Sequence, residues 1–199
     1  MADREDFFRT QFLFWLLCAV DGHAKNFSVF LEAGGGFRLI PRYDVPSAYP
    51  YLGAAQQNLS LHRVKMAMAV VGQNSHYKWK EIQARLWLET ARLCGLGARG
   101  RTLLEEVVES TSNVINQVES KLPSDIPGEM VEPIFTGLRE STARAKEQLR
   151  KYAAPQKKRR SRGFFRRTAS LVTPVYASQP MYGSTSHVAS FDVFPTCVA

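Results

Sequence analysis

The chain has 199 residues, 45% of them hydrophobic and 11% aromatic, and a formal net charge of +8. This length and apolar content suffice for one domain with a hydrophobic core and a tail, and the aromatic content excludes a chain that is disordered throughout. From Gln156 to the C-terminus there are seven basic residues and one acid, Asp192, a net of +6, so the rest of the chain carries only about +2. Composition therefore excludes a body that binds nucleic acid through a strongly basic surface.

The cysteines and histidines do not have the pattern of a disulfide framework or of a metal site. Cys18, Cys94 and Cys197 are far apart, odd in number and not arranged as CxxC, so a reducing, cytoplasmic location is expected. The four histidines do not pair with each other or with cysteines at zinc-ligand spacing. The apolar run at residues 12–20 is too short to cross a bilayer, so no membrane association is expected.

The N-terminal part predicts a buried helix followed by a β-hairpin. Residues 5–19 are apolar on nearly all sides of a helix, which is typical of a helix in the middle of a domain. After a polar segment at residues 21–26, two β-branched and aromatic runs, residues 27–31 and 37–40, flank Gly34-Gly35-Gly36. Two such runs around a glycine turn predict a hairpin.

The rest of the body is expected to be helical. Apolar spacing predicts a helix at residues 79–94, capped by Gly95, and a third amphipathic helix at residues 130–152, interrupted early by Pro133. Between them, Thr102 and Glu105 have capping-box spacing and predict the start of a helix that ends near Pro123. The expected fold class is mainly α with a small β-hairpin, with Trp15, Trp79 and Trp87 in the core.

The chain divides at about residue 152 into a body, residues 1–152, and a tail, residues 153–199. The tail opens with the basic run at residues 157–167 and continues as a Ser/Thr/Tyr/Pro-rich stretch without helical or strand periodicity. That composition predicts a mostly disordered segment. The basic run at residues 157–162 is compatible with nucleic-acid binding, although a solvated charge block is the favoured interpretation.

Three polar side chains around the predicted hairpin have the pattern of a phosphoryl-transfer site. Asp21 and Asn26 have the spacing that protein-kinase catalytic loops use between the base and a metal-binding asparagine. Because the hairpin returns the chain, Asp44 can lie beside Asn26, and the pair offers the carboxylate and amide oxygens that Mg²⁺ prefers. Lys25 is placed to offset charge on the transferring phosphoryl group, and His23 is placed to fix the loop by hydrogen bonding.

Asp-x-x-x-x-Asn alone is common by chance, and for it the favoured reading is an ordinary turn rich in Asx residues. The longer string is more specific. DGHAKNFS at residues 21–28, the hairpin, and YDVPSAYP at residues 43–50 are very similar to the C-terminal signature of the HipA family. KMAMAV at residues 65–70 and HYKW at residues 76–79 add to the resemblance, which extends over about residues 7–152.

This resemblance implies the C-terminal lobe of a serine/threonine kinase, with Asp21 as catalytic base and with Asn26 and Asp44 as magnesium ligands beside ATP. HipA-type kinases are toxins held inactive by a HipB-like DNA-binding antitoxin, and the expected protein substrate is an aminoacyl-tRNA synthetase. In the family a nucleotide-gripping N-terminal lobe precedes the catalytic loop, whereas here only 20 residues precede Asp21. Either a separate N-lobe polypeptide completes the kinase, or the chain is a non-catalytic binding module or gene remnant.

Overall fold

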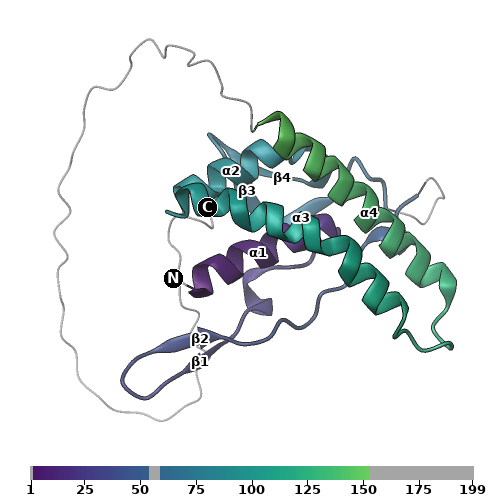
Figure 1. The fold of residues 1–199 in the computed structure, drawn as a ribbon, viewed down its shortest axis with the longest axis horizontal. Helices are drawn as coiled ribbons and strands as arrows, with labels where there is room; N and C mark the ends of the chain where they lie inside the picture. Colours follow the sequence, from purple (N-terminus) through teal and green to yellow (C-terminus); the bar gives the residue numbers. More distant parts are fainter. Residues whose placement is uncertain (1, 54–58, 153–199) are drawn as a thin grey trace. The chain divides into compact units, whose positions relative to one another are not determined.

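The computed structural model describes residues 2–53 and 59–152, and the predicted tail lies outside them. This part of the chain contains four α-helices: α1 (Ala2–Leu16), α2 (Ala84–Leu93), α3 (Gly97–Glu119) and α4 (Gly128–Lys151). Two antiparallel hairpins pair β1 (Val29–Leu31) with β2 (Phe37–Leu39) and β3 (Lys65–Val71) with β4 (Ser75–Lys78). Three 3₁₀ turns complete the set: η1 (Ala24–Asn26), η2 (Tyr49–Tyr51) and η3 (Trp79–Glu81). The β1–β2 hairpin projects away from the helices (Figure 1).

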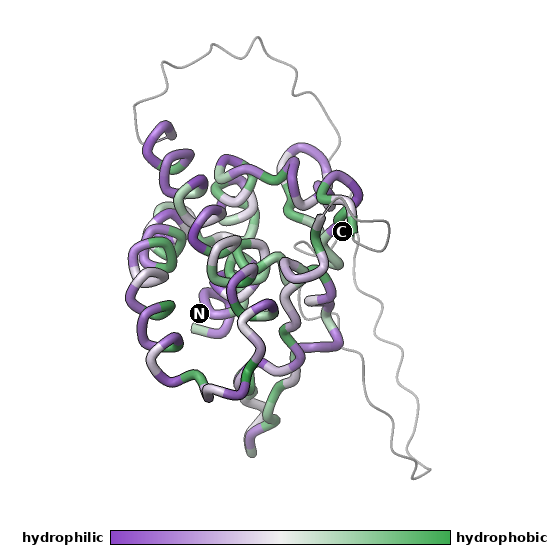
Figure 2. Tube along the Cα trace, turned by 90° about the vertical axis from the view of Figure 1, so that its right-hand side faces the viewer, coloured by the Kyte–Doolittle hydropathy of each residue, from purple (hydrophilic) through white to green (hydrophobic). Residues whose placement is uncertain are grey.

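Helix α1 runs through the core, as its apolar sequence predicts. Its aromatic side chains Phe12, Phe14 and Trp15 are at most 1% exposed. The Trp87 ring from α2 packs edge-on against Phe12, with ring centroids 5.4 Å apart. All three tryptophans are buried, which confirms their predicted place in the core. Figure 2 shows polar and apolar residues interspersed along the helices, as expected of helices with one buried face.

A reciprocal pair of hydrogen bonds joins α1 to the turn η3. The Trp15 indole donates from Nε1 to the carbonyl of Trp79 at 3.2 Å, and the Trp79 indole donates to the carbonyl of Trp15 at 2.7 Å. A buried indole N–H needs an acceptor, because burial without one costs the desolvation of the group. The two tryptophans satisfy this need for each other and hold segments 64 residues apart together.

Helix α1 ends in a Schellman motif that has cysteine where glycine is usual. The amide of Ala19 bonds the carbonyl of Phe14 at 2.8 Å, the amide of Cys18 bonds that of Trp15 at 3.1 Å, and Cys18 has φ of 51°. Cys18 is fully buried, and this burial raises the pKa of its thiol to about 12 despite the nearby Arg144. The thiol therefore stays neutral and packs as a small apolar group.

The carbonyls that follow this helix end accept hydrogen bonds from three distant parts of the chain. The Leu16 carbonyl accepts from the Tyr49 hydroxyl at 2.8 Å and from Ser141 Oγ of α4 at 2.6 Å. Three further donors bond the carbonyls that come next along the chain. Ser47 Oγ donates to the carbonyl of Leu17, the Ala48 amide to that of Cys18, and the Ala67 amide of β3 to that of Val20. Helix ends leave carbonyls without intrahelical partners, so an end buried in the core needs donors from elsewhere.

The second hairpin, β3–β4, differs from the sequence-based expectation of a single hairpin followed only by helices. Val64, Met66, Met68 and Val70 are buried while their neighbours in β3 are more exposed, which is the two-residue period of a strand. The sequence hides this alternation, because the intervening Ala67 and Ala69 are also apolar and alanine is depleted in strands. The strand is fixed instead by pairing with β4 and by Thr90 of α2, whose hydroxyl bonds both backbone groups of Val71.

Helix boundaries also differ from those predicted. Helix α1 begins and ends three residues before the expected range of 5–19, and α2 begins at Ala84 because residues 79–81 form the turn η3. The predicted capping box at Thr102 is wrong, since α3 already begins at Gly97 and Thr102 lies inside it. Helix α4 continues through Pro133 without the predicted interruption. The predicted first hairpin is confirmed, with Phe30 opposite Arg38.

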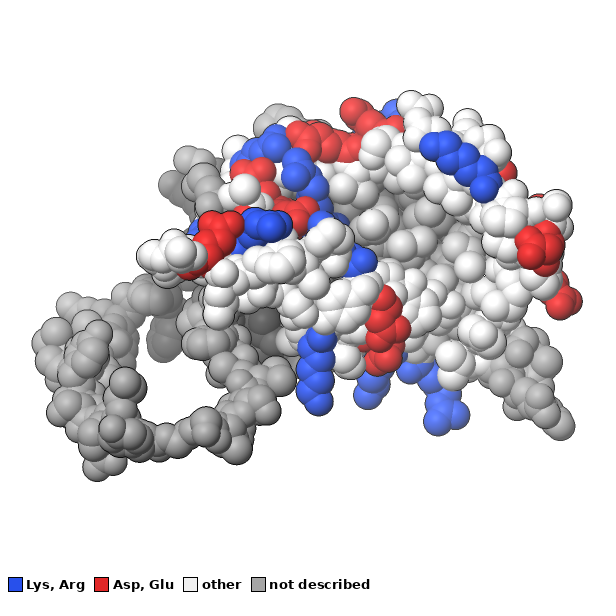
Figure 3. Space-filling view, turned by 90° about the horizontal axis from the view of Figure 1, so that it is seen from below, with Lys and Arg blue, Asp and Glu red and all other residues white. Residues whose placement is uncertain are grey.

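No helix in the described ranges is both long enough and apolar enough to cross a membrane. On the face drawn in Figure 3, acidic and basic side chains lie beside one another and do not form a patch of one sign. Among the described residues, basic and acidic side chains also form ion pairs, for example Arg9 with Glu106 at 2.7 Å and Arg99 with the same carboxylate at 2.7 Å. This face is therefore not a basic surface, in agreement with the low net charge of the body.

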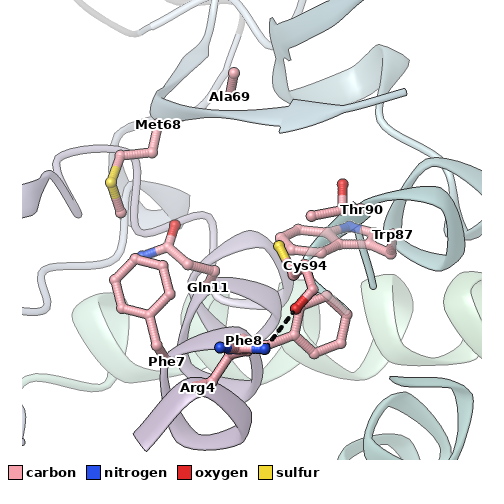
Figure 4. Close-up of a pocket in the computed structure, with 9 residues that line it drawn as sticks. All are labelled: Arg4, Phe7, Phe8, Gln11, Met68, Ala69, Trp87, Thr90 and Cys94. Atoms are coloured by element: carbon pink, nitrogen blue, oxygen red, sulfur yellow. Dashed lines mark hydrogen bonds between the residues drawn. The ribbon is translucent and has the colours of Figure 1, made fainter. Parts of the chain in front are cut away.

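A small cavity lies between α1, α2 and β3 (Figure 4). Its volume is about 30 Å³, which is room for one or two water molecules and not for an organic ligand. On its wall, Arg4 donates from Nη1 to the carbonyl of Cys94 at 3.2 Å. Gln11 Nε2 is buried there without a hydrogen-bond partner, so a water molecule in this cavity has a donor to bind.

The two hydroxyl donors on the Leu16 carbonyl predict a non-additive effect on stability. We expect Ser141→Ala and Tyr49→Phe each to lower the free energy of unfolding by about 1 kcal/mol, because the carbonyl keeps one donor in each case. The double variant should lose more than the sum, because a buried carbonyl is then left without a partner. Urea denaturation of all four proteins measures this coupling.

Ser110→Ala is the matched control, since this α3 hydroxyl also bonds a helix carbonyl, that of Val107 at 3.1 Å, but is exposed. Its effect should be close to zero. Strict additivity of the Ser141 and Tyr49 variants would contradict the shared-carbonyl account.

Candidate functional site

The loop that carries the predicted catalytic residues begins directly after the α1 Schellman motif. Its path depends on Gly22, where a Cβ atom would lie 2.2 Å from Cδ2 of the Phe14 ring. Such an approach is closer than carbon atoms tolerate, so only glycine allows the backbone to pass over this ring. The loop leaves the site through Phe27, whose ring packs against Phe7 and Phe14 of α1 with centroids 4.7 and 5.9 Å apart. Both ends of the loop are therefore fixed on α1.

Asn26 is the most buried polar residue of the loop. It is 5% exposed, its backbone amide bonds the carbonyl of His23 at 3.0 Å, and its side-chain Oδ1 accepts from the His23 amide at 3.3 Å. Its Nδ2 donates to Oδ2 of Asp44 at 2.8 Å. The structure thus brings Asn26 and Asp44 together across the β1–β2 hairpin, as the order of the segments along the chain predicts.

Asp44 has a left-handed backbone, with φ of 54°. This region is uncommon for residues other than glycine, but aspartate tolerates it better than most, and such conformations persist where surrounding contacts hold them. The neighbouring Arg42 supplies two such contacts with α1: an ion pair with Asp6 and a hydrogen bond from its Nε to Oγ1 of Thr10 at 2.7 Å. At the end of β2, the Leu39 amide bonds the carboxylate of Asp3 at 3.0 Å.

Tyr43 is a positioning residue that the sequence reasoning missed. Its hydroxyl donates to the carbonyl of Lys25 at 3.1 Å and lies 2.8 Å from Oγ of Ser28, which can donate to it. It therefore links the segment that carries Asp44 to the loop that carries Asn26. The position of Tyr43 next to the candidate ligand Asp44 could have indicated this role, because a tyrosine hydroxyl is a hydrogen-bond donor and acceptor at the end of a long side chain.

The other three predicted site residues are more loosely placed. The Asp21 side chain is 69% exposed, and its Oδ1 lies 3.9 Å from Nε2 of His23. His23 fixes the loop through its backbone, while its buried Nδ1 has no hydrogen-bond partner. Lys25 is exposed and contributes its carbonyl, not its ammonium group, to the contacts of the loop. No hydrogen bond connects Asp21 with Asn26 or Asp44 within the described ranges.

Asn26 and Asp44 can supply only some of the ligands that a Mg²⁺ ion needs. No group of three or more His, Cys, Asp or Glu side chains suited to a metal occurs in residues 2–53 and 59–152. Asn26 offers an amide oxygen and Asp44 a carboxylate; in the structure Nδ2 of Asn26 donates to this carboxylate, while its Oδ1 accepts from the His23 amide. Magnesium is commonly held by one or two carboxylates, with water and substrate phosphates as its other ligands, so these residues fit a metal that arrives with a nucleotide.

The bridging role of Tyr43 is testable without any assay of activity. Tyr43→Phe removes the hydroxyl, so we expect faster hydrogen exchange of the loop amides at residues 23–28 and a loss of stability of about 0.5–1.5 kcal/mol. Tyr77→Phe is the matched control, because both tyrosines are 41% exposed and Tyr77 lies on β4, away from the loop. NMR-detected exchange separates the two. Equal exchange in both variants would count against the bridge.

A comparison with protein-family models adds an independent finding. The model described as HipA-like C-terminal domain matches residues 1–119, from the start of α1 to the end of α3. The match begins before the expected residue 7 and ends before the expected residue 152, so it leaves α4 outside. It includes Gly22, Asn26, Tyr43 and Asp44, together with both hairpins. Because more than half of the chain is matched, the protein belongs to the HipA family, through its HipA-like C-terminal domain.

Proposed function

We propose that the body is the catalytic lobe of a HipA-type serine/threonine kinase, which transfers the γ-phosphoryl group of ATP to a protein hydroxyl. The observation that carries the proposal is the 2.8 Å contact between Asn26 and Asp44, two residues 18 positions apart. In this contact the Asn26 amide nitrogen donates to the Asp44 carboxylate, so it places side by side an asparagine and an aspartate, the residue types that hold magnesium against nucleotide phosphates in kinases. Membership of the HipA family supports the same assignment.

In this proposal Asp21 accepts the proton of the substrate hydroxyl while that oxygen forms a bond to the γ-phosphorus. The bond between the γ-phosphorus and the bridging oxygen breaks, and ADP leaves. The exposure of Asp21 suits a base that must meet a hydroxyl on another protein. His23 lies next to this carboxylate, and the exposed Lys25 can offset charge on the transferring group. Magnesium, held by Asn26 and Asp44, neutralises phosphate charge when bound.

Phosphoryl transfer also needs a lobe that covers the nucleotide. In residues 2–53 and 59–152 the strands form only two short hairpins, so the proposal assigns that lobe to a separate N-lobe polypeptide or to chain outside these residues. Family resemblance alone suggests the remaining partners: a HipB-like DNA-binding antitoxin, and an aminoacyl-tRNA synthetase as protein substrate. The alternative is a non-catalytic module that binds an antitoxin, and it predicts no transfer under any condition.

Magnesium binding provides the first test. Titration with MgCl₂ should shift the NMR signals of the Asn26 side-chain amide and the Asp44 backbone, with weak affinity, because two donors leave most ligand positions to water. Asp44→Asn should remove the response. Asp125→Asn is the control, because Asp125 is an exposed aspartate in the loop between α3 and α4. Shifts confined to other residues would contradict the assignment.

The second test measures activity after reconstitution. The body with ATP alone should transfer little, since its two described hairpins do not form a lobe that covers the nucleotide, and addition of an N-terminal lobe from another HipA-type protein should restore transfer from radiolabelled ATP. Asp21→Asn should then lower the rate by about 10²–10⁴, the usual loss for a general base. Asp44→Ala should be at least as damaging, and His23→Ala less so. Asp125→Asn again serves as the control.

Reconstituted activity that does not depend on Asp21 would contradict its role as base. Failure with every lobe tested would favour the non-catalytic module.

A further inference from the structure

A second, larger cavity lies between α4 and the turns η2 and η3, away from the catalytic loop. Its volume is about 410 Å³, which is within the range of sites for small organic ligands. Its lining comprises Tyr49, Leu52, Leu61 and Trp79 together with residues of α4. Helix α4 lies beyond the residues matched by the family model, so this cavity is not part of the matched domain alone.

Arg144 of α4 contributes a positive charge with unusual surroundings. Its guanidinium lies over the rings of Trp79 and Trp15, 4.8 and 5.6 Å from their centroids. Its Nε and Nη2 are buried and have no hydrogen-bond partner. A guanidinium has five donors, and ring stacking satisfies none of them by a hydrogen bond. The arginine on this wall therefore lacks an anionic acceptor in the described part of the chain.

Glu140 lies one helical turn earlier on the same wall and carries the opposite charge. Glutamate and arginine four residues apart on a helix usually pair, as Glu147 and Lys151 do on α4 at 2.6 Å. Glu140 and Arg144 do not pair, since no contact within 4.0 Å joins them. The arginine instead turns toward the tryptophans. Neither charged group has an ionic partner among the described residues; Glu140 is exposed, whereas Nε and Nη2 of Arg144 reach a molecule in the cavity only if the guanidinium turns toward it.

We propose that this cavity binds a free α-amino acid with an aromatic or large apolar side chain. Its carboxylate is recognised by Arg144, its ammonium group by Glu140, and its side chain lies against Tyr49 and Trp79. A ligand with only one charge leaves either the arginine or the glutamate without a partner, whereas a zwitterion satisfies both. The apolar walls favour a hydrophobic side chain over a polar one.

Occupancy of the cavity has a structural consequence. Ser141, which donates to the Leu16 carbonyl at the end of α1, also lines the cavity. A ligand that binds only the folded protein stabilises it by mass action, so binding should raise the stability of the fold to which this contact belongs. This inference is independent of the proposed kinase activity, because none of the residues assigned to phosphoryl transfer lines the cavity.

Isothermal titration calorimetry with three related probes tests the proposal. L-Phenylalanine has both charges, 3-phenylpropionate lacks the ammonium group, and phenethylamine lacks the carboxylate. We expect phenylalanine to bind, and each of the other two to bind at least about tenfold more weakly, since each leaves one charged group unpaired. L-Phenylalanine should also raise the thermal midpoint of unfolding.

Variants assign the two contacts. Glu140→Gln should weaken phenylalanine binding about tenfold and leave 3-phenylpropionate binding unchanged, while Arg144→Gln should weaken both. Glu147→Gln is the matched control, because this exposed glutamate of α4 pairs with Lys151 and should not affect any probe. If Arg144→Gln does not fold, Glu140→Gln still tests the proposal, because Glu140 is exposed and its substitution should not affect folding. The proposal is overturned if phenylalanine does not bind the folded protein, if 3-phenylpropionate binds as tightly, or if Glu140→Gln has no effect.

Discussion

The buried C-terminal end of α1 is the constraint on which the rest of the body depends. A helix end leaves carbonyl groups without partners, and here those carbonyls lie in the core, where water cannot replace the missing donors. Tyr49, Ser141 and the β3 backbone supply these donors from three separate regions of the chain. The contacts that solve this hydrogen-bonding problem also assemble the domain, because each donor brings its own element onto α1.

Both parts of the candidate site are also attached to helix α1. The loop with Asn26 leaves the C-terminal end of α1, and the segment with Asp44 is tied to the N-terminal half of α1 through Arg42. The two halves of the site therefore share one rigid element, and the β1–β2 hairpin between them can project outward without disturbing their separation (Figure 1). Such positioning by packed secondary structure is what phosphoryl transfer requires, since most of its catalysis comes from geometry and electrostatics.

Helix α4 extends this arrangement beyond the part of the chain that the family model matches. Gly137 allows close contact, because a Cβ at that position would lie 2.4 Å from the ring of Tyr49. One turn later, Ser141 reaches the end of α1 and Arg144 reaches the two tryptophans that bond each other. The same face of α4 thus closes the core and lines the larger cavity. Ser141 belongs to both, because it lines the cavity and bonds the end of α1.

The sequence by itself determined the features that depend on local pattern. The apolar character of α1, the hairpin around three glycines and the closeness of Asn26 to Asp44 follow from periodicity, turn residues and the order of elements. Only the tertiary structure decided the strand β3, the left-handed Cys18 at the end of α1 and the bridge from Tyr43, because each depends on a partner outside its own segment: Val20 and Thr90 for β3, the Ala48 amide for Cys18 and the Lys25 carbonyl for Tyr43. A methionine–alanine stretch becomes a strand, and a cysteine takes the place of glycine, when long-range hydrogen bonds and burial outweigh weak local propensities.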